Sequence, residues 1–96
     1  MDKPIGVIGS GNFGSVIANI IARNNRKVLL YVRDEKVIHR ILEKRDNRGH
    51  KMHKNILPTD DMAYLADQCE VIFPIVPSEH FRAMMKKLAP HLHRRV

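Results

Sequence analysis

The sequence predicts an α/β fold, a doubly wound and mainly parallel sheet with helices on both faces. Three observations support this prediction. Short apolar runs typical of buried strands alternate along the chain with segments in which apolar residues recur at helical spacing. A glycine-rich turn joins the first of these runs to the first helical segment. Strands that alternate with helices in this way pair in parallel, with connections that place the helices on the faces of the sheet.

The first half of the chain contains two predicted strands and two predicted helices. Ile5 to Ile8 is an apolar run that ends in a glycine, as expected of a strand buried on both faces. A helix is predicted from about Asn12 to Arg23, and a second buried strand from Val28 to Val32. Asp34 stands where an N-cap would, and the helix after it is predicted to end near Arg45. The expected inner faces of the two helices are Val16, Ile17, Ile20 and Ile21 beside Ala18 and Ala22, and Val37, Ile38, Ile41 and Leu42.

The second half begins with a polar and basic segment. Asp46 to Asn55 contains one glycine and is predicted to be a surface loop. Ile56 to Pro58 is expected to form a short edge strand, because proline cannot donate to the ladder of a central strand. Thr59 to Asp61 then offers N-cap residues for a short helix from Met62 to Ala66.

The last two predicted elements are a strand and a helix. Val71 to Val76 is expected to be another buried strand, although Pro74 removes one ladder donor within it. Ser78 is expected to cap the final helix. The predicted inner face of this helix consists of Phe81, Met84, Met85 and Leu88.

The composition argues for one domain without nucleic acid as its main partner. The 96 residues carry a net charge of +7, but the basic residues lie in several separate stretches and only five residues are aromatic. Nucleic-acid binders usually have a compact basic stripe or interleaved aromatic residues. Attraction of a polyanionic cofactor, or a solvated face, accounts for the charge instead.

Other functional classes are also disfavoured. No apolar run approaches the roughly 20 residues that span a bilayer, so no membrane insertion is expected. The single Cys69 can form no internal disulfide, which suits a cytoplasmic location, and it is expected to be a small buried residue rather than a nucleophile. The six histidines lack the tightly spaced partners of a metal site, so no metal is expected. No set of serine, histidine and aspartate resembles a triad, and no catalytic residue is assigned.

The sequence Gly9-x-Gly11-x-x-Gly14 joins the first predicted strand to the first predicted helix. The first glycine permits a tight turn, the second lets the backbone approach a cofactor diphosphate, and the third lets helix and strand pack closely. The diphosphate would then lie on free N–H groups at the positive end of the helix dipole. An apolar strand precedes the motif and a second strand closes the βαβ unit, so we interpret it as a Rossmann-type dinucleotide site. The alternative is a glycine turn that only makes close packing possible.

The end of the second predicted strand indicates which cofactor is favoured. An acidic side chain there usually binds the ribose hydroxyls of NAD, whereas an arginine can bind the 2′-phosphate of NADP. This chain has both, as Arg33 and Asp34, and Asp34 has an alternative role as a helix cap. Arg33 comes first and its guanidinium suits a phosphate, so NADP(H) is favoured over NAD(H).

A second element facing the cofactor is expected at the end of the last predicted strand. In an open α/β sheet, ligands lie beyond the carboxyl ends of the strands where the strand order reverses. This places the backbone around Val76, Pro77 and Ser78 beside the nicotinamide half of the cofactor. Alternatively, Pro77 only ends the strand and Ser78 only caps the helix.

The residues from Val7 to Ala18 resemble the opening of bacterial NAD(P)-dependent glycerol-3-phosphate dehydrogenase. The resemblance continues, in order and at the spacing of the family, through Leu30 to Asp34, Asn55 to Asp61 and Ala66 to Ser78. It therefore covers essentially the whole chain. The segment from Asp46 to Lys54 departs from the family pattern, because it is more basic.

The resemblance implies a function and a set of cofactor-binding residues. The family reduces dihydroxyacetone phosphate to sn-glycerol 3-phosphate, a phospholipid precursor, in the cytoplasm. By the resemblance, Asn12 and Phe13 contact the cofactor and Arg33 lies next to the adenosine ribose. The complete expected set is Gly9, Ser10, Gly11, Asn12, Phe13, Gly14, Arg33, Asp34, Val76 and Pro77.

The resemblance also implies that residues 1–96 are an incomplete NAD(P)-binding Rossmann domain. The helical carboxyl-terminal domain of the family, which carries the catalytic lysine and the site for the small phosphorylated substrate, is absent from this sequence. We therefore expect little or no turnover from this chain alone, and a homodimer is one candidate assembly. Two other functions stay open from the residues themselves. One is the cofactor domain of another NAD(P)-dependent dehydrogenase, for a 3-hydroxy acid or a ketopantoate-type substrate, and the other is a non-catalytic nucleotide-binding module.

Overall fold

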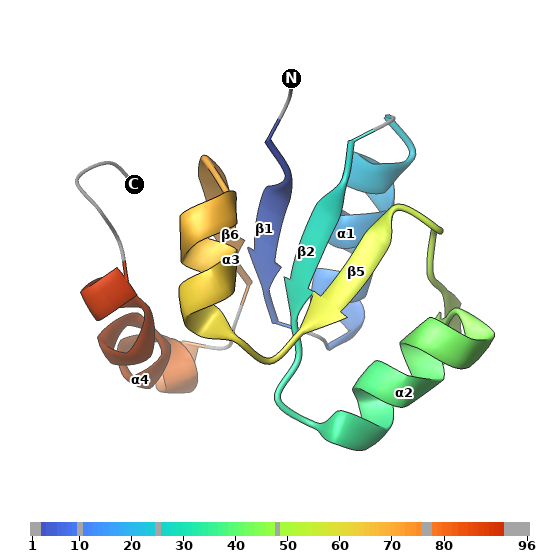
Figure 1. Cartoon of the computed structure of the whole chain (residues 1–96). Coiled ribbons are helices and arrows are strands. Elements are labelled where there is room, and N and C mark those ends of the chain that lie inside the picture. The colour runs from blue at the N-terminus through green and yellow to red at the C-terminus, as the bar shows by residue number, and fades with distance from the viewer. Residues whose placement is uncertain (1–2, 10, 25, 48, 76–77, 92–96) are drawn as a thin grey trace.

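The computed structural model describes residues 3–9, 11–24, 26–47, 49–75 and 78–91, and in these ranges it has the predicted α/β fold. A four-stranded parallel sheet has the order β5-β2-β1-β6 (Figure 1). The strands are β1 (Ile5–Ile8), β2 (Val28–Tyr31), β5 (Ile56–Thr59) and β6 (Val71–Pro74). In β1 all four residues are buried, and in β2 three of the four are, as predicted for central strands.

The helices cover both faces of this sheet. They are α1 (Asn12–Ala22), α2 (Glu35–Lys44), α3 (Met62–Gln68) and α4 (Ser78–Leu88), which leads into the 3₁₀ turn η1 (Ala89–His91). Val7 belongs to one buried cluster with residues of α1 and α2, whereas its neighbour Ile8 belongs to another with residues of α3 and α4. Successive strand residues point to opposite faces, so the two clusters lie on opposite sides of the sheet. None of the helices in the described ranges is long and apolar enough to cross a membrane.

The starts of α2 and α3 agree with the predicted caps. Asp34 accepts a hydrogen bond from the backbone N–H of Lys36 at 2.9 Å, and Asp61 accepts one from that of Tyr64 at 3.0 Å. Both aspartates satisfy an N–H group that has no partner within its own helix. α3 continues two residues beyond its predicted end at Ala66.

β5 lies at one edge of the sheet, as the proline in it predicts, but the prediction for β6 is partly wrong. β6 ends at Pro74 rather than Val76, and Val71, Phe73 and Pro74 are exposed instead of buried. In the part of the chain that the structure describes, β6 pairs only with β1 and forms the second edge. An apolar run alone does not say whether a strand has one neighbour or two, so the sequence could not separate these cases.

The segment from Asp46 to Asn55 is more ordered than the predicted surface loop. It contains a short antiparallel pair, β3 (Asp46–Asn47) and β4 (His50–Lys51), and it packs on α1. Asn47 and Met52 are each only 2% exposed, and Met52 joins the buried cluster on the α1 side of the sheet. The loop prediction is therefore wrong for these two residues.

The predicted inner faces of the helices are correct only in part. In α2 Ile41 is buried, and in α4 Met84 and Leu88 are buried. Four other residues of the predicted faces are instead exposed, and these are Val16, Ile20, Leu42 and Phe81. In α1 the sheet is met by small side chains, which let the helix lie close to it. These buried residues of α1 are Gly14, Ser15, Ala18 and Ala22.

Candidate functional site

The carboxyl ends of the three strands β2, β1 and β6 meet at one edge of the sheet. Gly9 follows β1, Val32 follows β2 and Ile75 follows β6. From β1 the chain passes through α1 to β2 on one side, whereas β6 lies on the other side, so the strand order reverses at β1. This is the position at which open α/β sheets bind ligands.

Two of the three glycines in the turn are required by the backbone. Gly9 has a φ of 127°, and a Cβ atom on it would collide with the carbonyl oxygen of Ile75. A Cβ atom on Gly14 would collide with the carbonyl oxygen of Gly9. The turn therefore lies tightly between β6 and α1, as the motif predicts.

Gly11 differs, because a Cβ atom built on it meets nothing within 4 Å. It is the N-cap of α1 and provides no side-chain hydrogen bond to the first turn, which also contains no acidic residue. The backbone N–H groups of that turn point out of the helix end, where the helix dipole is positive. The turn therefore offers an anion an open approach at Gly11.

Two polar side chains from the β3–β4 segment contact the start of α1. Asn47 donates from Nδ2 to the hydroxyl oxygen of Ser15 at 2.9 Å, and both residues are buried. The Nε2 atom of His50 lies 3.2 Å from Oδ1 of Asn12. Sequence reasoning missed both residues, since these pairs are 32 and 38 positions apart and the segment itself carries no recognisable pattern.

The predicted adenosine-side residues lie just beyond β2. Arg33 and Asp34 are both exposed, and Asp34 is engaged as the cap of α2. At the first turn of α1 Asn12 is exposed, and Phe13 has 65% of its surface exposed. The structure therefore brings the described glycines to the same edge as Asn12, Phe13 and Arg33. The side chains of these last three residues lie on the surface.

The nicotinamide side of the expected site is described only up to Ile75. The backbone N–H of Ile75 donates to the carbonyl oxygen of Ile8 at 2.7 Å, which continues the β1–β6 pairing to the glycine turn. Ser10, Val76 and Pro77 lie outside the described residues, and so does the side chain of Ser78.

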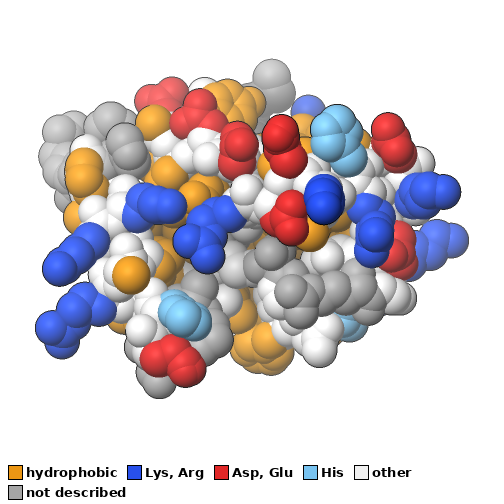
Figure 2. Space-filling view, turned by 90° about the horizontal axis from the view of Figure 1, so that it is seen from below, with side chains coloured by type: hydrophobic (Ala, Val, Ile, Leu, Met, Phe, Trp, Pro, Cys, Tyr) orange, Lys and Arg blue, Asp and Glu red, His pale blue; other side chains and the backbone are white. Residues whose placement is uncertain are grey.

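Basic side chains flank this edge of the molecule. Figure 2 views the edge from below: Lys and Arg side chains lie on both sides of a central area where hydrophobic side chains are visible, and Asp and Glu side chains lie on the same face. Lys87 of α4 donates from Nζ to the hydroxyl of Tyr31, the last residue of β2, at 3.5 Å. Basic side chains are thus present around the candidate site, together with acidic ones.

Cys69 is not an activated thiol, and the described residues form no metal site. Burial raises the pKa of the Cys69 thiol to about 11, so the thiol stays protonated at neutral pH. Within the described ranges, no group of three or more His, Cys, Asp or Glu side chains could hold a metal ion. The described residues at the glycine turn instead support the binding of an anion.

Comparisons with known proteins agree with this geometry. A sequence model of the family described as "NAD-dependent glycerol-3-phosphate dehydrogenase N-terminus" matches residues 4–96. The NAD(P)+ glycerol-3-phosphate dehydrogenase of Pseudomonas savastanoi is 35% identical over an alignment of 96 residues that covers 96% of this chain and 27% of that protein. That of Pseudomonas paraeruginosa is 36% identical over an alignment of 93 residues that covers 93% of this chain and 26% of that protein. The chain thus spans about a quarter of the length of these relatives.

Solved structures show the same fold. The glycerol-3-phosphate dehydrogenase of Saccharomyces cerevisiae matches with a TM-score of 0.89 at 21% identity, over 100% of this chain and 32% of that one. The enzyme of Coxiella burnetii matches with a TM-score of 0.85 at 19% identity, over 99% of this chain and 30% of that one. The fold, the glycine turn and the match over residues 4–96 agree, and the chain belongs to the NAD-dependent glycerol-3-phosphate dehydrogenase family, in which it corresponds to the N-terminal region.

Proposed function

We propose that this chain binds the diphosphate of NAD(H) or NADP(H) at the glycine turn, as the cofactor-binding part of a glycerol-3-phosphate dehydrogenase. The observation that carries the proposal is the division of roles among the three glycines. Gly9 and Gly14 fix the backbone against its neighbours, while Gly11 leaves an open approach to the N-terminal end of α1. The names of the curated relatives, which include NAD(P)+, support this choice of ligand.

The remaining cofactor contacts extend from the turn in two directions. Asn12 and Phe13 are exposed at the first turn of α1, where they can contact the diphosphate and its neighbouring groups. Arg33 lies at the adenosine side, and its guanidinium can pair with a 2′-phosphate. Asp34 is engaged as a helix cap, which supports a preference for NADP(H) over NAD(H). On the nicotinamide side the proposed contacts are Val76 and Pro77.

When bound, such a cofactor would supply the hydride for the reduction of dihydroxyacetone phosphate to sn-glycerol 3-phosphate. The residues of this chain orient the cofactor for that step, by holding its diphosphate and adenosine half at the edge of the sheet. Substrate binding and proton transfer belong, in this proposal, to the parts of the relatives that the chain does not span. The role of this chain is therefore binding and orientation.

The test is a calorimetric titration of the 96-residue chain with NADPH and with NADH. Wild type is expected to bind, and Gly11→Val to lose binding, because its side chain would fill the open approach at a position where a Cβ atom meets nothing within 4 Å. Ala63→Val on α3 also places a valine at an exposed position, on the other face of the sheet, and it should bind as wild type does. Failure of the wild type to bind either cofactor, or equal binding by Gly11→Val, would overturn the proposal.

A further inference from the structure

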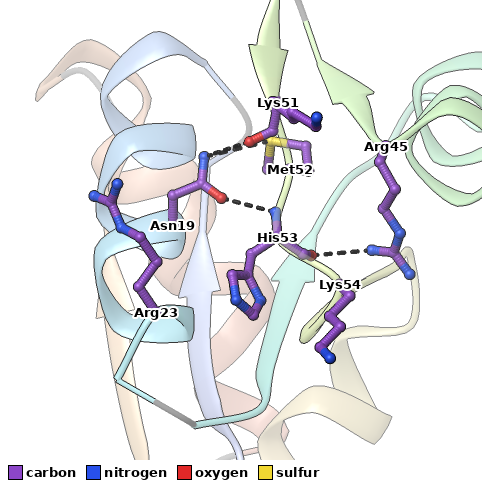
Figure 3. A pocket seen from close by; sticks show the side chains of 7 residues that line it. All are labelled: Asn19, Arg23, Arg45, Lys51, Met52, His53 and Lys54. Atoms are coloured by element: carbon purple, nitrogen blue, oxygen red, sulfur yellow. Dashed lines mark hydrogen bonds between the residues drawn. The ribbon is translucent and has the colours of Figure 1, made fainter.

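A second site of a different kind lies on the α1 side of the sheet. A pocket of about 490 Å³ opens between the second half of α1 and the segment that leads into β5 (Figure 3). We call it the basic pocket, because five of its lining residues are basic, and these are Arg23, Arg45, Lys51, His53 and Lys54. His53 and Lys54 precede β5, so the pocket lies toward the amino ends of the strands.

The basic pocket is separate from the glycine turn. Its lining residues on α1 and at the C-cap of this helix are Asn19 and Arg23, which stand five and nine residues after Gly14, or about 8 and 14 Å along the helix axis at 1.5 Å per residue. The glycine turn adjoins the carboxyl ends of the strands, and the pocket adjoins their amino ends. A ligand in one site leaves the other accessible.

The walls of the pocket are held together by the side-chain amide of Asn19. Its Nδ2 donates to the carbonyl oxygen of Lys51 at 3.1 Å, and its Oδ1 accepts from the backbone N–H of His53 at 2.9 Å. On the opposite wall, Nη1 of Arg45 donates to the carbonyl oxygens of His53 and Ile56 at 3.2 and 2.6 Å. The backbone of the pocket is therefore fixed before any ligand arrives, which lowers the entropy lost on binding.

The pocket offers donors and positive charge. Nδ1 of His53 accepts a hydrogen bond from the backbone N–H of Asn55 at 3.0 Å, so the neutral ring carries its proton on Nε2 and donates there. In Figure 3 this ring lies between the side chains of Arg23 and Lys54. Arg23, Lys51 and Lys54 are exposed and have long flexible stems. Among the described residues that line the pocket, none is a carboxylate.

We propose that the basic pocket binds a small ligand that carries two or more phosphate groups. Arginine and lysine together suit phosphate, since arginine supplies a planar pair of donors and lysine a compact charge. Arg23 stands at the end of α1, and Lys51 and Lys54 stand on the segment that leads into β5 (Figure 3), so a ligand with several phosphate groups can pair with more of these charges than a single phosphate can. The volume is within the range of about 300 to 1,000 Å³ that is usual for small-molecule sites. The inference goes beyond the proposed function, because cofactor binding at the glycine turn does not require this pocket.

The test uses inorganic tripolyphosphate as the probe and calorimetry at low and moderate salt. Arg23→Gln/Lys54→Gln should weaken binding by about tenfold or more, because two charge-assisted contacts are lost. The matched control, Arg82→Gln/Lys86→Gln, removes the same charge from exposed positions of α4 on the opposite face of the sheet and should bind as wild type does. In a nuclear magnetic resonance titration of Gly11→Val, in which the glycine turn is blocked, tripolyphosphate should still shift the backbone amides of His53 and Lys54.

Two further measurements separate this proposal from the cofactor proposal. Gly11→Val should keep its affinity for tripolyphosphate while losing NADPH, and the pocket variant should keep its affinity for NADPH. The pocket proposal fails if Gly11→Val does not bind tripolyphosphate, or if both charge variants weaken this binding equally. A chain that binds tripolyphosphate in the pocket but no NADPH would overturn only the cofactor proposal.

Discussion

At the scale of single residues, the three glycines of the turn are needed for different reasons. Gly9 and Gly14 stand against backbone carbonyl groups, and neither position has room for a Cβ atom. Gly11 has a φ of −76°, which any residue can adopt, and open space around it. Glycine is therefore needed at two of these positions by the fold and at the third by the proposed ligand.

Gly14→Ala should destabilise the chain by about 2 to 4 kcal/mol, because its Cβ atom would force the backbone of Gly9 to move. Gly11→Ala should leave the free energy of unfolding at or slightly above that of wild type. Urea unfolding followed by circular dichroism measures both. If the two variants lose the same stability, the assignment of different roles is wrong.

Arg33 should discriminate between the two cofactors. Arg33→Ala is expected to weaken NADPH binding by about tenfold and NADH binding much less, because only NADPH carries the 2′-phosphate. Arg40→Ala, at an exposed position of α2, is the matched control and should change neither dissociation constant. An equal loss for both cofactors in Arg33→Ala would remove the phosphate contact from the proposal.

Cys69 should react slowly in the folded chain. Burial raises the pKa of its thiol from 9.0 to about 11, and below pH 9 this lowers the thiolate fraction by about 100-fold. Folding favours the neutral thiol, so its contribution to stability is present below pH 9 and is lost as the pH rises toward 11. Iodoacetamide should therefore alkylate the folded chain far more slowly than the chain in urea, with the difference shrinking above pH 9. Equal rates at pH 8 would contradict this.

At the scale of elements, the β3–β4 segment is what most distinguishes the structure from its prediction. Polar and basic residues with one glycine are typical of a loop, yet Asn47 and Met52 are buried against α1. The partner of Asn47 is Ser15, which lies 32 positions earlier in the chain. A pairing over such a distance leaves no periodic signal, so it could be found only in three dimensions.

Asn47→Ala should destabilise the chain by about 1 to 3 kcal/mol, since it removes a buried hydrogen bond and leaves the Ser15 hydroxyl without this donor. It should also weaken NADPH binding, because Ser15 lies in the first turn of α1 next to Gly14. Asn24→Ala is the exposed control, with an expected change within about 0.5 kcal/mol. Thermal unfolding and calorimetry provide the two readings, and unchanged NADPH affinity would separate the segment from the site.

The helices illustrate what spacing can and cannot predict. Helical spacing located all four helices and most of their ends, and Asp34 and Asp61 were recognisable as caps from their residue type and position. For α1 it placed the buried Ala18 and Ala22 on the inner face, but it also placed Val16 and Ile20 there, and these are exposed. This helix is apolar around most of its circumference, and Ala18 and Ala22, rather than the larger Val16 and Ile20, allow the closest approach to β1. Size complementarity between surfaces is not written in the period of one helix.

At the scale of the whole molecule, the parallel sheet and the glycine site at its carboxyl edge were predictable. The alternation of apolar runs with helical segments predicts the parallel sheet. The position of Gly9 directly after a strand predicts the glycine turn at the carboxyl edge of that sheet. The number of neighbours of β6 was not predictable, because Val71 and Phe73 fit a buried strand or an edge strand equally well by sequence. The basic pocket was not predictable either, because its walls come from α1 and from a segment about thirty positions later.

The 96-residue chain should bind cofactor without turning it over. With NADPH and dihydroxyacetone phosphate it is expected to give no measurable oxidation of NADPH, because orientation of the cofactor alone does not hold a substrate against it. The absorbance of NADPH measures this, and a family enzyme of full length is the positive control. Turnover by this chain that Gly11→Val abolishes would show that its own residues suffice for the reaction.

The two edge strands share a property that affects how copies of this chain meet one another. The carbonyl oxygen of Thr59 accepts a hydrogen bond from the backbone N–H of Val32, and the backbone N–H of Ile75 donates one to the carbonyl oxygen of Ile8. Thr59 and Ile75 therefore direct their backbone groups into the sheet. Consecutive strand residues point their backbone groups in opposite directions, and the ring nitrogens of Pro58 and Pro74 therefore face outward. A strand from another molecule that aligned with either edge would find one donor missing, which disfavours growth of the sheet from copy to copy. Within the described residues, each edge strand of the sheet therefore carries a proline that hinders pairing with another copy.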